Sequence, residues 1–231
     1  MSSATITTSV RLMNSTPQTE EQAMVRKVAV SSFLGNFIEW FDYASYSYFA
    51  TTIALVFFPT DNHTVAMLQT FGVFALSFIL RPIGALFWGS YGDKKGRKAA
   101  LAHSIMFMSG ASFLIGCLPS YSVIGVGAPI LLLLLRMVQG FSASGEYAGA
   151  ATFLGEYAPT SKRGIYCSLI PASTAIGLLA GSTLATLMTA NMNSSAMVGW
   201  GWRVPFLLAG PLGLIVLYIR AKLADSPSTS R

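Results

Sequence analysis

The chain has 231 residues, of which 53% are hydrophobic and only 10% are charged, whereas a soluble domain usually carries about 25% charged residues. This composition excludes an ordinary soluble domain and indicates a membrane protein, because apolar stretches of ~20 residues are typical of membrane spans. The formal net charge of +6 does not indicate a nucleic-acid partner, because the basic residues gather in the breaks between apolar segments.

The first 27 residues are polar and rich in Ser, Thr and Gln. They lack the short apolar core and the small-residue cleavage site of a signal peptide. We therefore expect residues 1–27 to form a disordered cytoplasmic tail.

Six apolar segments follow, and each is long enough to cross a hydrocarbon core of about 30 Å as a helix. They are predicted at about 28–57, 66–89, 98–118, 128–157, 164–190 and 203–222. Helices are favoured because every backbone polar group must be satisfied within lipid, and the segments lack the alternation of a membrane barrel. The predicted fold is an all-α membrane protein with a six-helix transmembrane bundle over 28–222 and a second cytoplasmic tail at 223–231.

Most of the basic residues lie on one side of these spans. They are Arg11, Arg26, Lys27, Lys94, Lys95, Arg97, Lys98, Lys162, Arg163, Arg220, Lys222 and Arg231. Because positive charge is retained in the cytoplasm, both termini are predicted to be cytoplasmic. We expect an integral protein of the bacterial cytoplasmic (inner) membrane.

The first span contains the stretch GNFIEWFDYASY, which places Glu39 and Asp42 in an otherwise apolar and aromatic run. An ionisable group inside a membrane is by default functional and faces a cavity or a partner. The spacing of three residues puts both acids on one face of the helix, near the middle of the bilayer. Two carboxylates in a low-dielectric site repel one another, which favours proton binding by one of them. Both acids are therefore candidate proton carriers.

The fourth span carries Arg136, Gln139 and Glu146 on one broad face of a helix. The planar guanidinium of Arg136 suits a carboxylate, which could belong to a solute, to Asp42 or to Glu146. Our hypothesis is that Arg136 and Gln139 bind a solute and that Glu146 is a third proton-site candidate. The alternative is a set of buried ion pairs with no solute contact.

The remaining polar and aromatic residues are less specific. Trp40 and Tyr43 are candidate solute contacts, because aromatic faces bind ammonium groups, although such residues also serve packing. Arg81 is expected to extend its side chain toward the cytoplasmic face. The sequence contains no metal-ligand cluster and no nucleophile–His–acid set, so we expect neither a metal site nor an enzyme. A disulfide between Cys117 and Cys167 is not expected, because the two lie near opposite membrane faces.

Four motifs resemble a known family. GSYGDKKGRK at 89–98 is similar to the signature loop between helices 2 and 3 of the major facilitator superfamily. GNFIEWFDY, LRPIGALFWGSYGDKKGR, APILLLLLRMVQGFSASGEYAGA and GWGWRVPF resemble its metabolite:proton symporter branch, which includes proline/betaine, citrate, 2-oxoglutarate and shikimate transporters. The resemblance covers residues from about 30 to 227.

The resemblance implies a symporter that works by alternating access, driven by a proton gradient and without a cofactor. Its solute would be a small carboxylate-bearing metabolite, either an organic acid or a zwitterion such as proline or betaine. It also implies a cytoplasmic gate formed by Asp93, Arg97 and Glu156. Because such transporters consist of two six-helix halves, the chain corresponds to the N-terminal half. We expect it to need the missing C-terminal half or a partner chain, in addition to the lipid bilayer. The alternative is a truncated or accessory membrane protein that does not transport.

Overall fold

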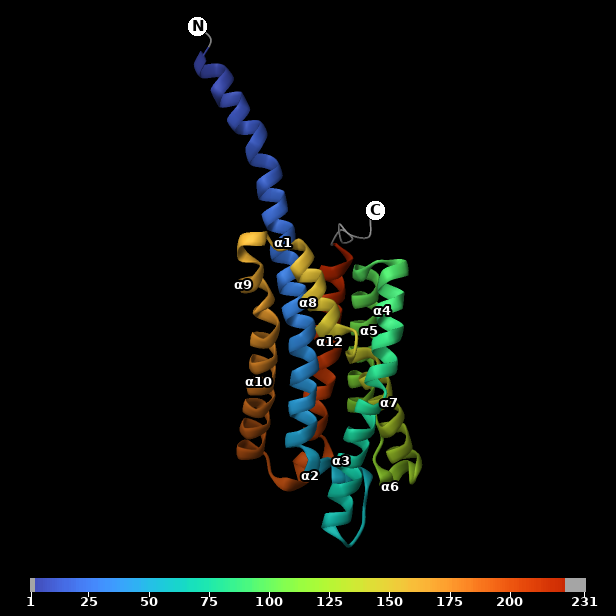
Figure 1. Cartoon of the computed structure of the whole chain (residues 1–231). Coiled ribbons are helices and arrows are strands. Elements are labelled where there is room, and N and C mark those ends of the chain that lie inside the picture. Colours follow the sequence, from blue (N-terminus) through green and yellow to red (C-terminus); the bar gives the residue numbers. More distant parts are fainter. Residues whose placement is uncertain (1–2, 223–231) are drawn as a thin grey trace.

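The computed structural model describes residues 3–222, with side chains from Gln22 onward. All of the regular structure in this part of the chain is helical, and the helices run alongside one another in one bundle (Figure 1). The α-helices are α1 (Ser3–Tyr48), α2 (Ala50–Phe57), α3 (His63–Ile79), α4 (Arg81–Lys95), α5 (Arg97–Cys117), α6 (Tyr121–Ile124), α7 (Gly127–Ala143), α8 (Glu146–Tyr157), α9 (Arg163–Cys167), α10 (Leu169–Asn191), α11 (Ser194–Gly199) and α12 (Val204–Ala221). Two 3-10 helices, η1 (Thr160–Lys162) and η2 (Gly201–Arg203), join longer elements.

Within the described residues, five stretches are long and apolar enough to cross a membrane. They are His63–Lys95, Arg97–Cys117, Gly127–Tyr157, Thr160–Asn191 and Gly201–Ala221. The remaining predicted span, the first one at 28–57, corresponds to the C-terminal part of α1 together with α2. It carries more polar residues than the others, but it packs inside the bundle against α10, α12 and α8. The prediction of an all-α membrane bundle is confirmed.

Local sequence explains where several helices begin and end. The side chain of Asn62 caps α3, because its Oδ1 accepts hydrogen bonds from the backbone N–H groups of Thr64 and Val65. Asn193 caps α11 in the same way. Gly96 separates α4 from α5 with a φ of 94°, a conformation that favours glycine. Pro82 lies in the first turn of α4, where its missing N–H costs least.

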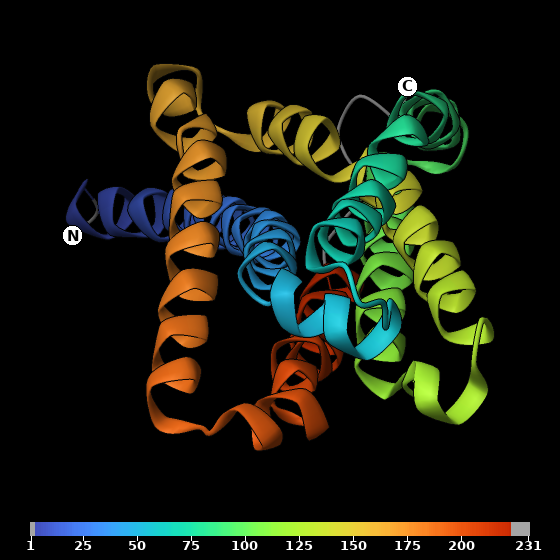
Figure 2. The same ribbon diagram turned by 90° about the horizontal axis from the view of Figure 1, so that it is seen from below.

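Close packing of α1 against α10 organises one side of the bundle (Figure 2). At Gly177 of α10, a Cβ atom would lie only 2.8 Å from the carbonyl oxygen of Phe37 on α1. The missing side chain therefore lets the two helices approach at backbone distance, as small residues do in membrane bundles. On the other side α5 packs against α12 and α7.

An aromatic and aliphatic core lies at the end of the bundle near α2 and α11. Tyr46, Phe57, Leu132, Trp202 and Phe206 are all buried there. The opposite end holds the α4–α5 junction, the end of α8, α9 and the end of α12 (Figure 1). The basic loops at 94–98 and 162–163 therefore share one end of the molecule.

The N-terminal segment differs from its prediction. Residues 1–27 are predicted to be disordered, but α1 begins at Ser3 and continues without a break to Tyr48. The sequence EEQAMVRK at 20–27 consists mostly of good helix formers, so the helix of the first span extends backward through it. The tail predicted at 223–231 lies outside the described residues.

Candidate functional site

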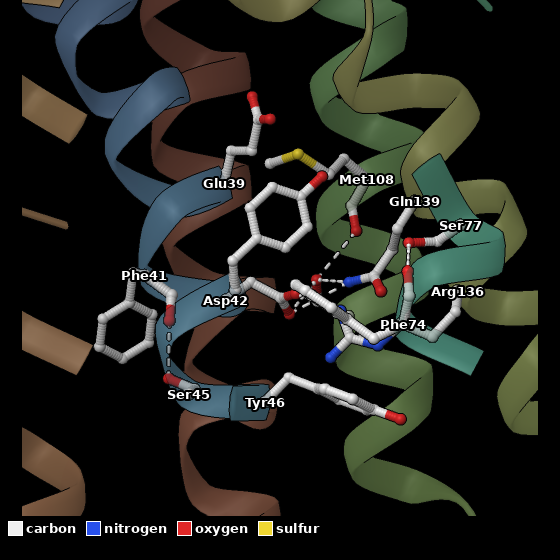
Figure 3. Close-up of polar contacts among 12 residues, drawn as sticks. Glu39, Phe41, Asp42, Ser45, Tyr46, Phe74, Ser77, Met108, Arg136 and Gln139 are labelled. Atoms are coloured by element: carbon white, nitrogen blue, oxygen red, sulfur yellow. Dashed lines mark hydrogen bonds and ion pairs between the residues drawn. The ribbon is translucent and has the colours of Figure 1, made fainter. Parts of the chain in front are cut away.

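A buried polar network links the middle of α1 to α5 and α7. Nη1 of Arg136 donates to Oδ2 of Asp42 at 2.7 Å. Oδ1 of Asp42 accepts from Oγ of Ser112 at 2.9 Å and from Nε2 of Gln139 at 3.1 Å. Asp42, Arg136, Gln139 and Ser112 are all buried, and Figure 3 shows the first three pointing toward one another. The network joins an acid and a cation within a region of low dielectric constant.

The guanidinium of Arg136 also lies over aromatic rings. It is 3.8 Å from the ring centroid of Tyr46 and 5.6 Å from that of Phe206. Such contacts stabilise a desolvated cation, and the hydroxyl of Tyr46 is in turn anchored on the carbonyl of Thr70 at 2.9 Å. Of the three partners considered for Arg136, the structure pairs it with Asp42. The side chain of Arg136 is completely buried, so in this conformation it does not face an open cavity.

Glu39 belongs to a second cluster, one turn of α1 away. Its Oε1 accepts a hydrogen bond from Nη2 of Arg81 at 2.5 Å, and the same nitrogen contacts the hydroxyl of Tyr43. In Figure 3 the carboxylate of Glu39 is directed away from the Asp42 network. Trp40 lies edge-on to Tyr43, with ring centroids 5.8 Å apart.

The structure corrects the prediction that the side chain of Arg81 extends toward the cytoplasmic face. Its side chain does not extend to the loop end of the bundle but pairs with Glu39 in the interior. Arg81 begins α4, and the loop at Gly96 lies about 20 Å further along the helix axis at a rise of 1.5 Å per residue. That separation is too long for the side chain to reach the loop end of the bundle, and Glu39 supplies its counter-charge.

Glu146 and Arg220 form a third buried ion pair. Oε2 of Glu146 also accepts a hydrogen bond from Oγ of Ser104 at 3.2 Å. Two predictions are corrected here. Glu146 does not face Arg136, because α7 ends at Ala143 and α8 starts a new helix at Glu146. Arg220 is not a free cytoplasmic charge, since its side chain is only 2% exposed.

The loop motif places its charges close together. Nε of Arg97 is 3.2 Å from Oε1 of Glu156, and Nη2 of Arg97 is 3.8 Å from Oδ1 of Asp93. All three side chains are partly exposed at the basic end of the bundle. The set expected for the cytoplasmic gate is thus brought together, joining the α4–α5 loop to the end of α8.

Sequence reasoning missed three members of these clusters. In the sequence, Arg81 and Arg220 stand out only as charges near the ends of spans. The acids of the spans indicate them indirectly. Glu39, Asp42 and Glu146 outnumber the one cation considered for them, Arg136, and each acid within a membrane needs a counter-charge. Ser112 carries no such signal, since a serine in an apolar helix is common. Among the described residues, no group of three or more His, Cys, Asp or Glu side chains is arranged to hold a metal ion.

The sequence and the fold both match known transporters. A profile of the sugar (and other) transporter family matches residues 27–228. The glycine betaine/proline/ectoine/pipecolic acid transporter OusA of Dickeya dadantii is 43% identical over 208 residues, which cover 90% of this chain and 42% of that protein. The proline/betaine transporter of Salmonella typhimurium is 42% identical over the same share of each chain. The chain therefore spans less than half the length of these relatives.

Solved structures agree with the fold. The partially occluded inward-open conformation of the xylose transporter XylE from E. coli superposes with a TM-score of 0.80 at 18% identity. The match covers 89% of this chain and 51% of that one. The proton:xylose symporter XylE bound to 6-bromo-6-deoxy-D-glucose, a protein of the major facilitator superfamily, gives the same TM-score at 16% identity. The relatives are transporters and not enzymes, as the sequence predicts for this chain.

Proposed function

The chain belongs to the sugar (and other) transporter family of the major facilitator superfamily, and on that premise we propose that it forms the N-terminal half of a proton-coupled symporter. Its solute is a small carboxylate-bearing metabolite, and the proline/betaine transporters among its relatives favour a zwitterionic osmolyte. The C-terminal half of the transport unit is supplied by further sequence or by a partner chain, because relatives are more than twice as long. The basic end faces the cytoplasm of a bacterial inner membrane, by the positive-inside rule.

The observation that carries this proposal is the ion pair between Asp42 and Arg136 in the interior of the bundle. Placing ionisable groups inside a membrane costs free energy, so such groups are by default functional. Binding of a proton to Asp42 removes its negative charge and weakens its hold on Arg136. The side chains around the pair then rearrange, which gives proton binding a structural consequence.

Glu39 stands as a second proton-site candidate, because it is buried and its Oε2 has no partner. Glu146 is a weaker one, since both of its oxygens are engaged by Arg220. Arg97 and Glu156 act as a gate at the cytoplasmic end, where their ion pair joins α8 to the α4–α5 loop.

The test is uptake of radiolabelled glycine betaine and proline. The chain is expressed in cells that lack their own carriers for these solutes, alone and together with the C-terminal half of OusA as a separate polypeptide. We expect uptake only with the second half, and we expect a protonophore to abolish it. Uptake that survives collapse of the proton gradient would exclude proton coupling, and no uptake in any combination would favour an accessory membrane protein.

The acids are separated by substitution in the same assay. Asp42→Asn and Glu39→Gln are each expected to reduce accumulation against a gradient, while Asp61→Asn, at an exposed acid between α2 and α3, serves as the carboxylate control. If both interior variants accumulate the solute as well as the unmodified chain does, neither acid carries the proton.

A further inference from the structure

The position of Arg81 is unusual for a membrane arginine. It lies near the middle of the apolar stretch His63–Lys95, yet its side chain is 27% exposed. An exposed guanidinium at this depth is too costly to face lipid. The exposed edge of Arg81 therefore marks a polar space on the surface of the half-bundle.

The residues around Arg81 come from α1 and α3. Phe78 and Tyr43 lie under the guanidinium, with their ring centroids 4.6 Å and 5.1 Å from its central carbon. Both hydrogen bonds of Arg81, to Glu39 and to Tyr43, use the same nitrogen, Nη2. The rest of the guanidinium fork is uncommitted, and its Nε has no hydrogen-bond partner.

Two further polar atoms lack a partner, one on Glu39, which pairs with Arg81, and one on Trp40, whose ring lies edge-on to Tyr43. Oε2 of Glu39 makes no hydrogen bond, although the side chain is only 2% exposed. The indole N–H of Trp40, on the next residue of α1, is also unpaired. Buried polar groups usually have partners, so the unpaired acceptor of Glu39 and the unpaired Nε of Arg81, which belong to two side chains in direct contact, point to a ligand that supplies both partners.

We propose that Glu39, Trp40, Tyr43, Phe78 and Arg81, here called the Arg81 subsite, bind a zwitterionic solute. The carboxylate of the solute accepts hydrogen bonds from Arg81 and from the indole N–H of Trp40. Its cationic group lies against Glu39 and the faces of the aromatic rings. The inference rests on the proposed transport function, and it assigns solute binding to Arg81 in place of Arg136.

The charges of the subsite favour a zwitterion over a dicarboxylate. Arg81 and Glu39 present one positive and one negative group side by side. A zwitterion complements both groups, whereas a dicarboxylate would place a second negative charge near Glu39, and like charges in a low-dielectric site repel strongly. Both arginines are paired with an acid, but Arg136 is fully buried whereas Arg81 is 27% exposed, so a solute can reach only Arg81 of the two in this conformation.

The test measures how solutes protect Arg81 from chemical modification. The full chain is reconstituted in lipid nanodiscs and treated with phenylglyoxal, and modification of each arginine is read by peptide mass spectrometry. Glycine betaine, choline and succinate are compared as protecting solutes. Arg26, which is exposed outside the subsite, is the internal control for reagent access.

We expect glycine betaine to slow modification of Arg81 several-fold while leaving Arg26 unchanged. Choline, which lacks a carboxylate, and succinate, which lacks a cation, are expected to protect far less. Equal or better protection by succinate would overturn the zwitterion assignment. Absence of protection by all three solutes would overturn the subsite itself.

A second measurement uses equilibrium binding of radiolabelled glycine betaine to the same nanodiscs. Because Arg81→Gln alone leaves Glu39 without its counter-charge, the double variant Arg81→Gln/Glu39→Gln is compared with Arg26→Gln. The double variant is expected to weaken binding by about 10- to 100-fold, the loss typical of a charge-assisted contact, and Arg26→Gln is expected to bind normally. Normal binding by the double variant would contradict the subsite.

The two proposals fail in different ways. If proton-coupled uptake occurs but Arg81 is neither protected nor needed for binding, the subsite is wrong and the transport function stands. If Arg81 is protected by glycine betaine but uptake is independent of the proton gradient, the subsite stands and proton coupling is wrong.

Discussion

The carboxylate of Glu146, at the start of α8, is clamped by both terminal nitrogens of Arg220, near the end of α12. The guanidinium also donates to the backbone carbonyls of Leu101 on α5 and Ser31 on α1. A single ion pair thus ties four helices together at the basic end of the bundle. Both side chains are almost fully buried, so each supplies the counter-charge that the other needs after desolvation.

We expect Glu146→Gln to destabilise the bundle by about 3–5 kcal/mol, because it leaves a buried arginine without a counter-charge. The double variant Glu146→Leu/Arg220→Met removes both charges and is expected to recover most of that loss. Thermal unfolding of the purified protein in detergent checks both variants. A double variant less stable than Glu146→Gln would contradict the interpretation that the unpaired charge is what costs stability.

Gly140 allows α7 to cross α3 at backbone distance. A Cβ atom at this position would overlap the carbonyl group of Ser77, which is backbone and cannot rotate away. Gly140→Ala is therefore expected to destabilise the bundle by about 1–3 kcal/mol. Gly72→Ala on α3 is the matched control, because a Cβ atom there meets nothing within 4 Å. Thermal unfolding of the two variants should separate them, and equal stabilities would refute the close crossing.

The Arg97–Glu156 ion pair is expected to affect transport more than stability. Its side chains are 30% and 23% exposed, and ion pairs of this kind contribute at most about 1 kcal/mol. Arg97→Gln should leave the unfolding temperature nearly unchanged but alter the uptake rate of the assembled transporter. The control is Lys94→Gln, which removes an exposed charge from the same loop but leaves the Arg97–Glu156 pair in place. A large loss of stability in Arg97→Gln would show a structural role instead of a gating one.

The two cysteines report the orientation of the bundle. Cys117 ends α5 and is exposed, whereas Cys167 ends α9 at the opposite, basic end. A membrane-impermeant maleimide applied to intact cells should label Cys117, and it should reach Cys167 only after the membrane is permeabilised. The variants Cys117→Ser and Cys167→Ser identify each signal. Labelling of Cys167 in intact cells would reverse the predicted orientation.

The sequence by itself determined the class of the molecule. Long apolar stretches have only one way to satisfy their backbone in lipid, so the helical bundle followed from composition and segment length alone. The loop motif at 89–98 identified the family, and the acids of the first span indicated a charged core. Both signals consist of residues that are close together in the chain, so the sequence alone reveals them.

Only the tertiary structure decided which charges meet. Asp42 pairs with Arg136, Glu39 with Arg81, and Glu146 with Arg220, and each pair joins residues at least 42 positions apart. Helical periodicity gives the face of a residue on its own helix, but it carries no information on which neighbouring helix packs against that face. The partners are selected by tertiary packing, which brings Arg81 of α4 and Arg136 of α7 to the acids of α1, and Arg220 of α12 to Glu146 of α8.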